Sequence, residues 1–342
     1  MEFKQQFAVL SGNAIFLEED VSTIEYYLNR QQWLNPGEQV LRLEKPGEGN
    51  MNFVRRVVSN QRSFILKQAR PWVEKYPQIA APLDRIGVEM QFYQVIQRDA
   101  FLKSFTPQLL YSDSTNYTIA LEDLGESADY TFLYEKGAVL PEEDLERLIK
   151  FLNQLHQQPF SEIEMEQYPS NQALKTLNHE HIFHYPYLVE NGFDLNNIQP
   201  GLQETALRYK HDTLLKEVIF DLGELYLGSS HTLLHGDYYP GSWLRAQGQV
   251  YVIDPEFSYF GRAEFDLGVL LAHLKMAQLP DAMLQKVKAS YRQSPNFDEE
   301  LLNAFIGVEI LRRMIGLAQL PLDLTLKEKQ HLLEEGRALI LG

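Results

Sequence analysis

The sequence predicts an α+β fold in two parts, an antiparallel sheet with one helix followed by a mainly helical part. Two patterns lead to this class. Short apolar runs alternate with Gly, Pro and Asn turns up to residue 124, whereas apolar residues recur at three- and four-residue steps from residue 141. At 342 residues with 44% hydrophobic content, the chain can fill two cores. We therefore expect an N-terminal lobe at residues 1–124 and a C-terminal lobe at residues 125–342.

The N-terminal lobe is expected to open with a short helix, because Ser22 and Glu25 have the spacing of a capping box and Pro36 stops the pattern. One helix is expected at residues 82–100. A sheet of about five strands should surround it. The runs that predict these strands lie at residues 39–46, 51–58, 63–69, 108–111 and 117–124.

The C-terminal lobe is expected to begin with a helix from Pro141 to His156. The polar, proline-containing stretch at residues 158–202 should be irregular, with at most short helices. Later helices are expected at residues 203–227, 264–278, 281–293, 298–319 and 325–340, and the clear strand signals lie at residues 232–234 and 249–253.

The charge and the residue composition of the chain exclude several kinds of binding partner. Lys and Arg number 31 against 47 Asp and Glu, and the net charge of −16 opposes broad contact with DNA or RNA. The absence of Cys removes disulfides and thiolate metal sites and fits a reducing cytoplasm. No run approaches the ~20 apolar residues that span a bilayer. We expect a soluble, cytoplasmic protein without nucleic-acid or membrane partners.

Two acidic clusters, His-Gly-Asp at residues 235–237 and Asp-Pro-Glu at residues 254–256, each follow an apolar strand. Phosphoryl transfer needs a group that orients and deprotonates an acceptor hydroxyl, and a divalent ion that offsets the phosphate charge. Asp237 is our candidate base, and Asp254 and Glu256 can both reach one Mg²⁺. Any one of these acidic residues alone would more often be structural than catalytic, as the cap of a loop or a partner in a salt bridge. Their combination favours an ATP-dependent kinase.

The N-terminal lobe offers candidate ATP ligands. Lys67 ends an apolar strand, where its ammonium group could meet phosphates, and Glu89 on the next helix could fix it by an ion pair. A lone lysine at a strand end is normally exposed. Gly47, Gly49 and Asn50 lie between two strands, where glycines let backbone amides approach phosphates. An ordinary hairpin turn is the alternative for that loop.

Two further pairs of residues have open interpretations. Glu122 and Leu124 end the last predicted strand of the first lobe, so the backbone there would form a hinge that binds adenine, or a plain interlobe linker. Arg312 and Arg313 are adjacent in a largely apolar helix, where two guanidinium groups are costly unless they are paired. Contact with a polar substrate and pairing with a buried carboxylate are equally open for them.

Taken together, these segments resemble the aminoglycoside phosphotransferase and choline kinase superfamily, which has the two-lobed protein-kinase-like fold. Within it the methylthioribose kinases are the most similar subfamily. The resemblance covers most of the chain and is carried by residues 47–54, 66–69, 121–124, 235–237, 252–257 and 312–318.

The resemblance implies that Asp237 is catalytic, that Asp254 and Glu256 hold Mg²⁺, and that Lys67 and the hinge bind ATP. It also implies that Arg312 and Arg313 contact the acceptor. The implied reaction moves the γ-phosphoryl group of ATP to the anomeric hydroxyl of methylthioribose, a step in methionine salvage. Members of the family are commonly homodimeric, which leaves a homodimer open for this chain.

Ser242 stands where the superfamily usually has a metal-binding Asn, as it also tends to in methylthioribose kinases, so it supports that subfamily. Two other departures from the family pattern lie near the expected acceptor: Tyr238 and Tyr239 follow the catalytic Asp, and Trp72 comes early in its loop. The acceptor therefore stays open between methylthioribose and an aminoglycoside, choline, homoserine or another sugar. An ATP-binding pseudokinase scaffold is the alternative from another class, although the candidate catalytic and ATP-binding residues are all present.

Overall fold

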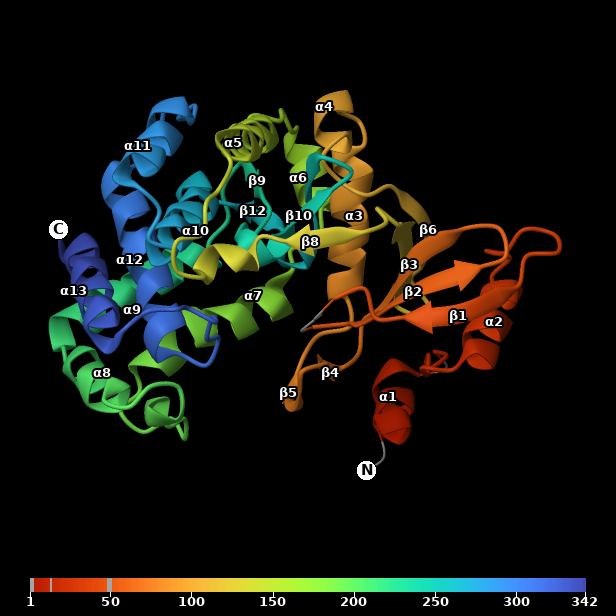
Figure 1. The fold of residues 1–342 in the computed structure, drawn as a ribbon, viewed down its shortest axis with the longest axis horizontal. Helices are drawn as coiled ribbons and strands as arrows, with labels where there is room; N and C mark the ends of the chain where they lie inside the picture. The colour runs from red at the N-terminus through yellow and green to blue at the C-terminus, as the bar shows by residue number, and fades with distance from the viewer. Residues whose placement is uncertain (1–2, 13, 48–50) are drawn as a thin grey trace. The chain divides into compact units, whose positions relative to one another are not determined.

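The computed structural model describes residues 3–12, 14–47 and 51–342 (Figure 1). The chain forms two compact units. The first contains residues 1–126 together with residues 254–257, and the second contains residues 127–253 and 258–342. Within the described ranges, no helix combines the length and the apolar character that crossing a membrane requires.

The first unit is built on a five-stranded antiparallel sheet with the strand order β1-β2-β3-β7-β6. Its strands are β1 Val40–Glu44, β2 Phe53–Ser59, β3 Ser63–Gln68, β6 Leu109–Asp113 and β7 Thr118–Glu122. All five predicted strands are confirmed. The central strand β3 pairs with β2 and β7, so that Lys67 lies opposite Val54 on one side and Ile119 on the other.

Side-chain alternation along β3 separates a core face from a site face. Phe64 and Leu66 are fully buried in a cluster with Ile24 and Leu28 of α2 Val21–Arg30. Lys67 necessarily points to the other face, where it meets α3 Arg85–Ile96. The helix predicted at residues 82–100 is confirmed as α3, and α4 Ala100–Lys103 follows it.

The predicted capping box of α2 is wrong. Asp20 is the N-cap, and its carboxylate accepts a hydrogen bond of 2.8 Å from the Thr23 amide. Ser22 lies in the first turn, and Glu25 instead accepts from the Val40 amide at 2.9 Å. An Asp two residues earlier competes successfully because its full negative charge also complements the positive end of the helix dipole.

Two elements of the first unit had no clear sequence signal. Helix α1 Phe3–Ser11 precedes α2, and a short hairpin joins β4 Trp72–Val73 to β5 Tyr76–Ala80. Trp72 is only 1% exposed, and its ring lies 5.2 Å from that of Phe3 and 6.5 Å from that of Phe16. This tryptophan therefore serves the packing of the first unit.

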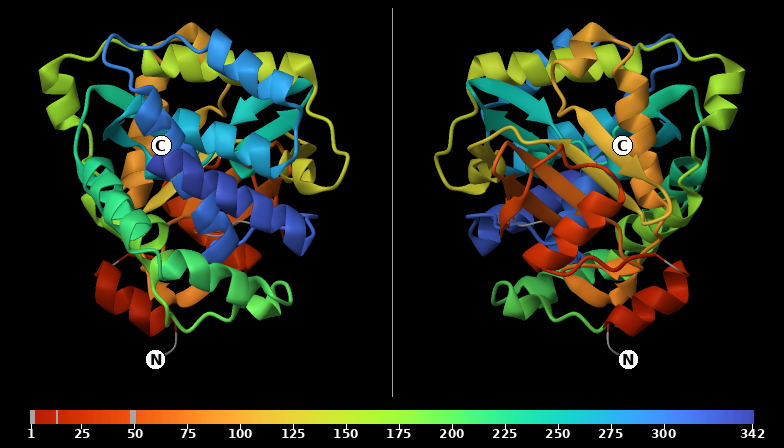
Figure 2. Two further views of the ribbon diagram at one scale, coloured as in Figure 1. Left: turned by 90° about the vertical axis from the view of Figure 1, so that its left-hand side faces the viewer. Right: turned by 90° about the vertical axis from the view of Figure 1, so that its right-hand side faces the viewer.

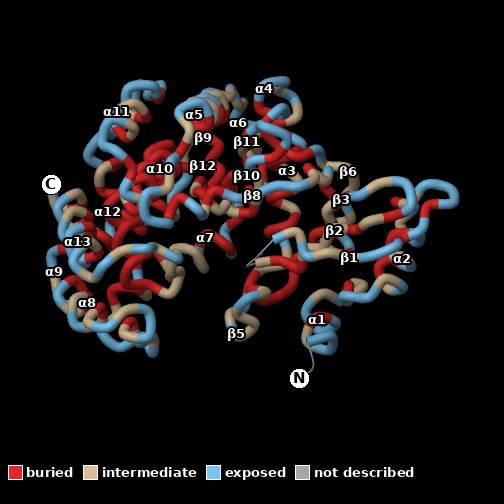
Figure 3. The backbone as a smooth tube through the Cα atoms, viewed as in Figure 1, coloured by how far each residue is buried: buried red, intermediate tan, exposed pale blue. Residues whose placement is uncertain are grey.

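The second unit is mainly helical, as predicted. Its longer helices are α5 Glu142–His156, α6 Glu162–Gln167, α7 Gln172–His179, α8 Leu202–Lys210, α9 Thr213–Leu227, α10 Ala263–Met276, α11 Asp281–Ser290, α12 Glu299–Ile315 and α13 Leu326–Leu341. Helices α10 and α12 are buried along nearly their whole length and form the core (Figure 3). Helix α13 lies along α12 (Figure 2), where Gly307 and Gly336 allow the two backbones to approach closely.

The stretch at residues 203–227, predicted as one helix, is two helices. Asp212 interrupts it, because its carboxylate caps α9 by accepting a 3.0 Å hydrogen bond from the Leu215 amide. The segment at residues 158–202 contains only short helices, as expected, including a π-helical turn η2 Glu180–His184 and the 3₁₀ turns η3 Tyr185–Tyr187 and η4 Leu195–Asn197.

Two small sheets carry the loops of the second unit. β9 Thr232–Leu234 pairs with β12 Tyr259–Gly261, and β11 Gln249–Val252 pairs with β10 Trp243–Ala246, which also pairs with β8 Ser127–Asp129. The predicted strands at residues 232–234 and 249–253 are confirmed. The other three strands have three or four residues each and were not recognised, because such short runs show no clear alternation. Residues 235–237 follow β9 directly.

Candidate active site

In the first unit, the structure brings Lys67, Glu89 and Asp254 together. The Lys67 Nζ lies 2.7 Å from Glu89 Oε2 and 2.8 Å from Asp254 Oδ1. The lysine and Glu89 are buried, whereas the Asp254 side chain is 49% exposed. Asp254 has a φ of 60°, a left-handed conformation that is uncommon outside glycine and often marks functional sites.

Electrostatics keeps the Lys67 ammonium group charged. Burial opposes its charge, but Asp254, Glu89 and Glu256 together raise the pKa of Lys67 above its ordinary value. Burial raises the pKa of Glu89 to about 7, although Lys67 acts in the opposite direction. A buried lysine that stays protonated, with one carboxylate behind it, can hold phosphate oxygens.

Glu256, in the 3₁₀ turn η6 Pro255–Phe257, joins a second buried network. Its Oε2 accepts from Asn52 Nδ2 at 3.0 Å and lies 3.2 Å from Arg85 Nε. Arg85 is fully buried and also donates to the carbonyl oxygens of Met51 at 2.9 Å and Arg70 at 2.8 Å. Burial raises the pKa of Glu256, and the cations of Lys67 and Arg85 oppose this.

Sequence reasoning missed Arg85 and Asn52. Arg85 precedes Glu89 by one helical turn, so α3 presents a cation and a carboxylate on one face. An arginine among the apolar residues of a helix that also carries the lysine's partner was the available signal, because a buried guanidinium group needs several acceptors.

The acidic pair Asp254 and Glu256 fits a magnesium ion that is bound together with phosphates. Mg²⁺ prefers oxygen ligands and is usually held by one or two carboxylates, with phosphates and waters completing its shell. Among the residues that the structure describes, no group of three or more His, Cys, Asp or Glu side chains could hold a metal. Two carboxylates leave the other positions in the shell of such an ion to phosphate oxygens and waters.

The remaining predicted ATP ligands stay predictions. Gly47 is exposed beyond β1, and Gly49 and Asn50 lie outside the described residues. Glu122 ends β7, where its amide donates to the Gln108 carbonyl at 2.8 Å and its carboxylate accepts from the Gln108 amide at 3.1 Å. Leu124 is buried. This pairing fixes the end of β7 where the hinge was predicted.

In the second unit, the loop that carries Asp237 is held by a buried carboxylate. Asp266 of α10 accepts from the amides of His235 at 2.7 Å and Gly236 at 2.9 Å. The His235 ring nitrogen Nε2 lies 2.9 Å from the Ile253 carbonyl. Gly236 has a φ of 84°, which a side chain would make costly. These bonds hold the backbone of the loop that presents Asp237, and sequence reasoning missed Asp266.

Asp237 has the environment of a base. Its side chain is 23% exposed, and its Oδ1 lies 3.4 Å from Arg313 Nη2 and 3.8 Å from Arg312 Nη2. Burial raises the pKa of Asp237 to about 6, although both guanidinium groups act to lower it. A pKa closer to neutrality makes the carboxylate a stronger base while it stays ionised at pH 7.

Arg312 and Arg313 pair with a buried carboxylate, one of the two possibilities that the sequence left open, and their contact with a substrate stays a prediction. The Arg312 Nε donates to Glu309 Oε2 at 2.5 Å, and the Arg313 Nε donates to Glu309 Oε1 at 2.8 Å. Their Nη2 atoms lie on the side of Asp237. The arginines therefore pair with a structural carboxylate and also face the candidate base.

The two tyrosines after Asp237 have different surroundings. Tyr238 is fully buried, donates to the Leu148 carbonyl at 2.9 Å and stacks on Phe151. Tyr239 is partly exposed, and the guanidinium carbon of Arg313 lies 4.9 Å from the centre of its ring. Of these two departures from the family pattern, Tyr239 is the one that lies beside Arg313.

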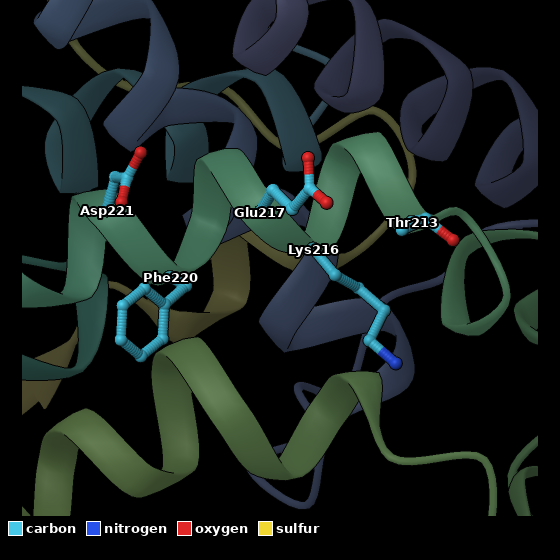
Figure 4. Close-up of a pocket in the computed structure, with 5 residues that line it drawn as sticks. All are labelled: Thr213, Lys216, Glu217, Phe220 and Asp221. Carbon is cyan, nitrogen blue, oxygen red and sulfur yellow. The ribbon is translucent and has the colours of Figure 1, made fainter.

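A separate hollow lies on the exposed face of α9 and is lined by Thr213, Lys216, Glu217, Phe220 and Asp221 (Figure 4). All five side chains come from successive turns of one helix. The hollow contains none of the candidate site residues, and we assign it no role in the chemistry.

Comparison with solved structures identifies the fold class. Choline kinase from Cryptosporidium parvum has a TM-score of 0.58 at 14% identity, with 94% of this chain and 96% of that chain covered. Choline kinase LicA from Streptococcus pneumoniae has a TM-score of 0.53 at 13% identity, with 94% and 98% covered. The predicted protein-kinase-like α+β fold is confirmed.

Sequence comparison identifies the family. The model of the phosphotransferase enzyme family matches residues 45–305, and the chain belongs to this family. Methylthioribose kinase from Exiguobacterium sibiricum is 26% identical, with 89% of each chain covered. The same enzyme from Bacillus velezensis is 24% identical, with 85% of this chain and 84% of the relative covered. The prediction of a phosphotransferase that acts on a hydroxyl group of a small molecule is confirmed.

Proposed function

We propose that this protein is an ATP- and Mg²⁺-dependent kinase that phosphorylates the anomeric hydroxyl of methylthioribose. The observation that carries the proposal is the arrangement of Asp237 opposite two arginines from one helix, at 3.4 and 3.8 Å. The named function of the relatives that match most of the chain supports this acceptor.

The residues of the first unit would bind the nucleotide. Lys67, kept charged by Glu89 and Asp254, would hold phosphate oxygens of ATP. Asp254 and Glu256 would hold Mg²⁺, which when bound offsets the negative charge of the transferred phosphoryl group. Arg85 and Asn52 keep the Glu256 carboxylate in place. The predicted hinge at Glu122 and Leu124 and the loop with Gly47, Gly49 and Asn50 would complete the ATP site.

The residues of the second unit would bind and activate the acceptor. Asp237 would take the proton of the reacting hydroxyl, since its raised pKa suits proton transfer near neutral pH. Arg312 and Arg313 carry only hydrogen-bond donors, so they would bind oxygen lone pairs of neighbouring hydroxyls. Asp266, which orients the loop, would keep the base aimed at that position.

The local hydrogen-bond donors favour a neutral acceptor over a cationic one. The chain as a whole has a net charge of −16, which would suit choline or an aminoglycoside. Beside Asp237, however, the carboxylates of Glu309 and Asp237 offset the two guanidinium groups, whose Nη atoms are donors that an ammonium group cannot accept from. A sugar hydroxyl oxygen can accept from these donors, so we expect methylthioribose as the first acceptor and other sugars as the second.

A panel of acceptors tests the proposal. The purified protein is incubated with ATP and Mg²⁺ and with methylthioribose, ribose, choline, homoserine or an aminoglycoside, and phosphorylated products are measured by ³¹P NMR. We expect methylthioribose 1-phosphate as the main product. ATP binding by calorimetry without any product would favour the pseudokinase alternative. Light scattering in the same preparation tests the homodimer that the family resemblance implies.

A further inference from the structure

A buried chain of hydrogen bonds lies behind the two acceptor arginines. The Tyr134 hydroxyl, in the 3₁₀ turn η1 Thr131–Tyr134, lies 2.6 Å from His273 Nδ1 of α10. The other ring nitrogen, Nε2, lies 2.8 Å from Glu309 Oε1 of α12. Tyr134 is 3% exposed, His273 0% and Glu309 2%. Three elements of the second unit, η1, α10 and α12, are therefore joined by one buried chain of hydrogen bonds that ends at the Glu309 carboxylate.

The hydrogen-bond partners fix the direction of each bond. Burial lowers the pKa of His273 to about 4, so the ring is neutral at pH 7 and carries one N–H. Because Glu309 can only accept, that proton is on Nε2, and Nδ1 accepts from the Tyr134 hydroxyl. Burial opposes the charge of Glu309, but Arg312 and Arg313 hold the pKa of Glu309 well below its ordinary value. Its carboxylate is therefore ionised.

Glu309 binds both arginines through the same part of their side chains. Its Oε2 accepts from Arg312 Nε and its Oε1 from Arg313 Nε. Holding a guanidinium group by Nε leaves its two Nη atoms pointing elsewhere, and each Nη2 lies on the side of Asp237. Among the described residues, Arg313 donates to both Glu309 and Asp237, whereas Arg312 donates to Glu309 and lies 3.8 Å from Asp237 as an ion pair.

We propose that Glu309, backed by His273 and Tyr134, is a positioning residue that presents the two arginines to the hydroxyl groups of the acceptor. The inference rests on the proposed function, because it takes Arg312 and Arg313 as acceptor ligands. Glu309 would fix both guanidinium groups before binding, which spares the acceptor the entropy cost of ordering two long side chains. His273 and Tyr134 would hold the carboxylate itself in one orientation.

The substitution Glu309→Gln tests this role with little change of shape. A glutamine amide can still accept through one atom, but its NH₂ group would face an arginine N–H, so at least one guanidinium group must move. We expect the KM for methylthioribose to rise about tenfold or more, because the loss of one hydrogen bond from a charged donor to the acceptor weakens binding by about that much. The KM for ATP should stay within about twofold of the wild-type value.

The matched control is Glu264→Gln in α10. Glu264 is also buried, at 3% exposure, pairs with Arg262 at 3.5 Å and accepts from the Asp298 amide at 2.9 Å, but it has no contact with Arg312, Arg313 or Asp237. Its acceptor KM should be unchanged. Tyr134→Phe removes only the distal hydroxyl and should raise the acceptor KM by a smaller factor, about two- to fivefold.

The outcomes separate the two proposals. An unchanged acceptor KM in Glu309→Gln overturns the positioning role, and if that variant does not fold, an unchanged KM in Tyr134→Phe overturns it. An equal rise in the KM values for ATP and for the acceptor also overturns it, because a general loss of structure would explain both. If the wild-type protein phosphorylates no sugar, the proposed function is wrong and the positioning role is overturned with it, whereas a working enzyme with an unchanged KM in Glu309→Gln overturns the positioning role alone.

Discussion

Arg85 links the candidate metal ligand Glu256 to the rest of the first unit, and removing it should be costly. We consider Arg85→Met, which keeps an unbranched side chain of similar length. The substitution removes the cation 3.2 Å from the buried Glu256 carboxylate and the donors to the carbonyl oxygens of Met51 and Arg70. Asn52 would still donate to the Glu256 carboxylate.

The size of the effect follows from burial. Arg85 is 0% exposed and Glu256 4%, so water reaches neither group. Removing one partner of such a pair typically costs about 3–5 kcal/mol, because the other charge stays buried. The lost hydrogen bond to the Arg70 carbonyl adds about 1 kcal/mol, whereas the Met51 carbonyl keeps the Glu74 amide as a donor at 3.3 Å. We expect a loss of about 4–6 kcal/mol, a large share of the roughly 5–15 kcal/mol that stabilises a typical domain.

Urea unfolding measures this loss. Trp33 and Trp72 lie in the first unit and Trp243 in the second, so a Trp243→Phe background lets fluorescence report on the first unit alone. The control Arg42→Met removes an arginine of β1 whose side chain is 61% exposed, and its midpoint should stay at the wild-type value.

A double variant makes the test sharper. Because Glu256→Gln removes the stranded charge, the combination of Arg85→Met with Glu256→Gln should be more stable than Arg85→Met alone. A loss below about 1 kcal/mol in Arg85→Met, or a double variant less stable than the single one, would refute this view of the network.

Three further predictions concern the pH profile, the nucleotide and the helix packing. Asp237 must be deprotonated to act as a base, and its pKa is raised to about 6. We therefore expect kcat/KM to be level above pH 7 and to fall tenfold per pH unit well below pH 6. A level profile down to pH 4 would contradict the role of Asp237. Lys67→Met should weaken ATP binding at least tenfold in calorimetry, and unchanged affinity would exclude Lys67 as a phosphate ligand. Gly307→Ala should lower the free energy of unfolding by about 1–3 kcal/mol, because the added Cβ would collide with the Gly336 carbonyl on α13. The control Gly87→Ala, in the open part of α3, should raise the free energy of unfolding by about 0.5–1 kcal/mol. Equal effects in the two variants would contradict the close packing of α12 and α13.

The sequence predicted the elements that local patterns encode. The strand ending at Lys67 and the helix carrying Glu89 followed from apolar periodicity, and the structure joins the two residues at 2.7 Å. The strands before Asp237 and Asp254 were recognised for the same reason. The capping box was misplaced because spacing alone cannot rank Ser22 against a carboxylate two residues earlier.

The supporting residues could not be predicted, because their roles depend on contacts between distant parts of the chain. Asp266 binds two amides about thirty positions earlier, and Glu256 meets Asn52 across more than two hundred positions. His273 and Tyr134 reach Glu309 only after three elements have packed. A buried polar residue in an apolar helix was the shared signal of Arg85, Asp266, His273 and Glu309, but such a residue names no partner.

The most direct test of the central claim is the rate of methylthioribose phosphorylation by Asp237→Asn. The amide keeps the size of the side chain but cannot accept the proton of the acceptor hydroxyl, so kcat should fall about 10²- to 10⁴-fold. ATP affinity should be retained, because the proposed nucleotide ligands lie in the other unit. A variant that phosphorylates methylthioribose at the wild-type rate would contradict the account.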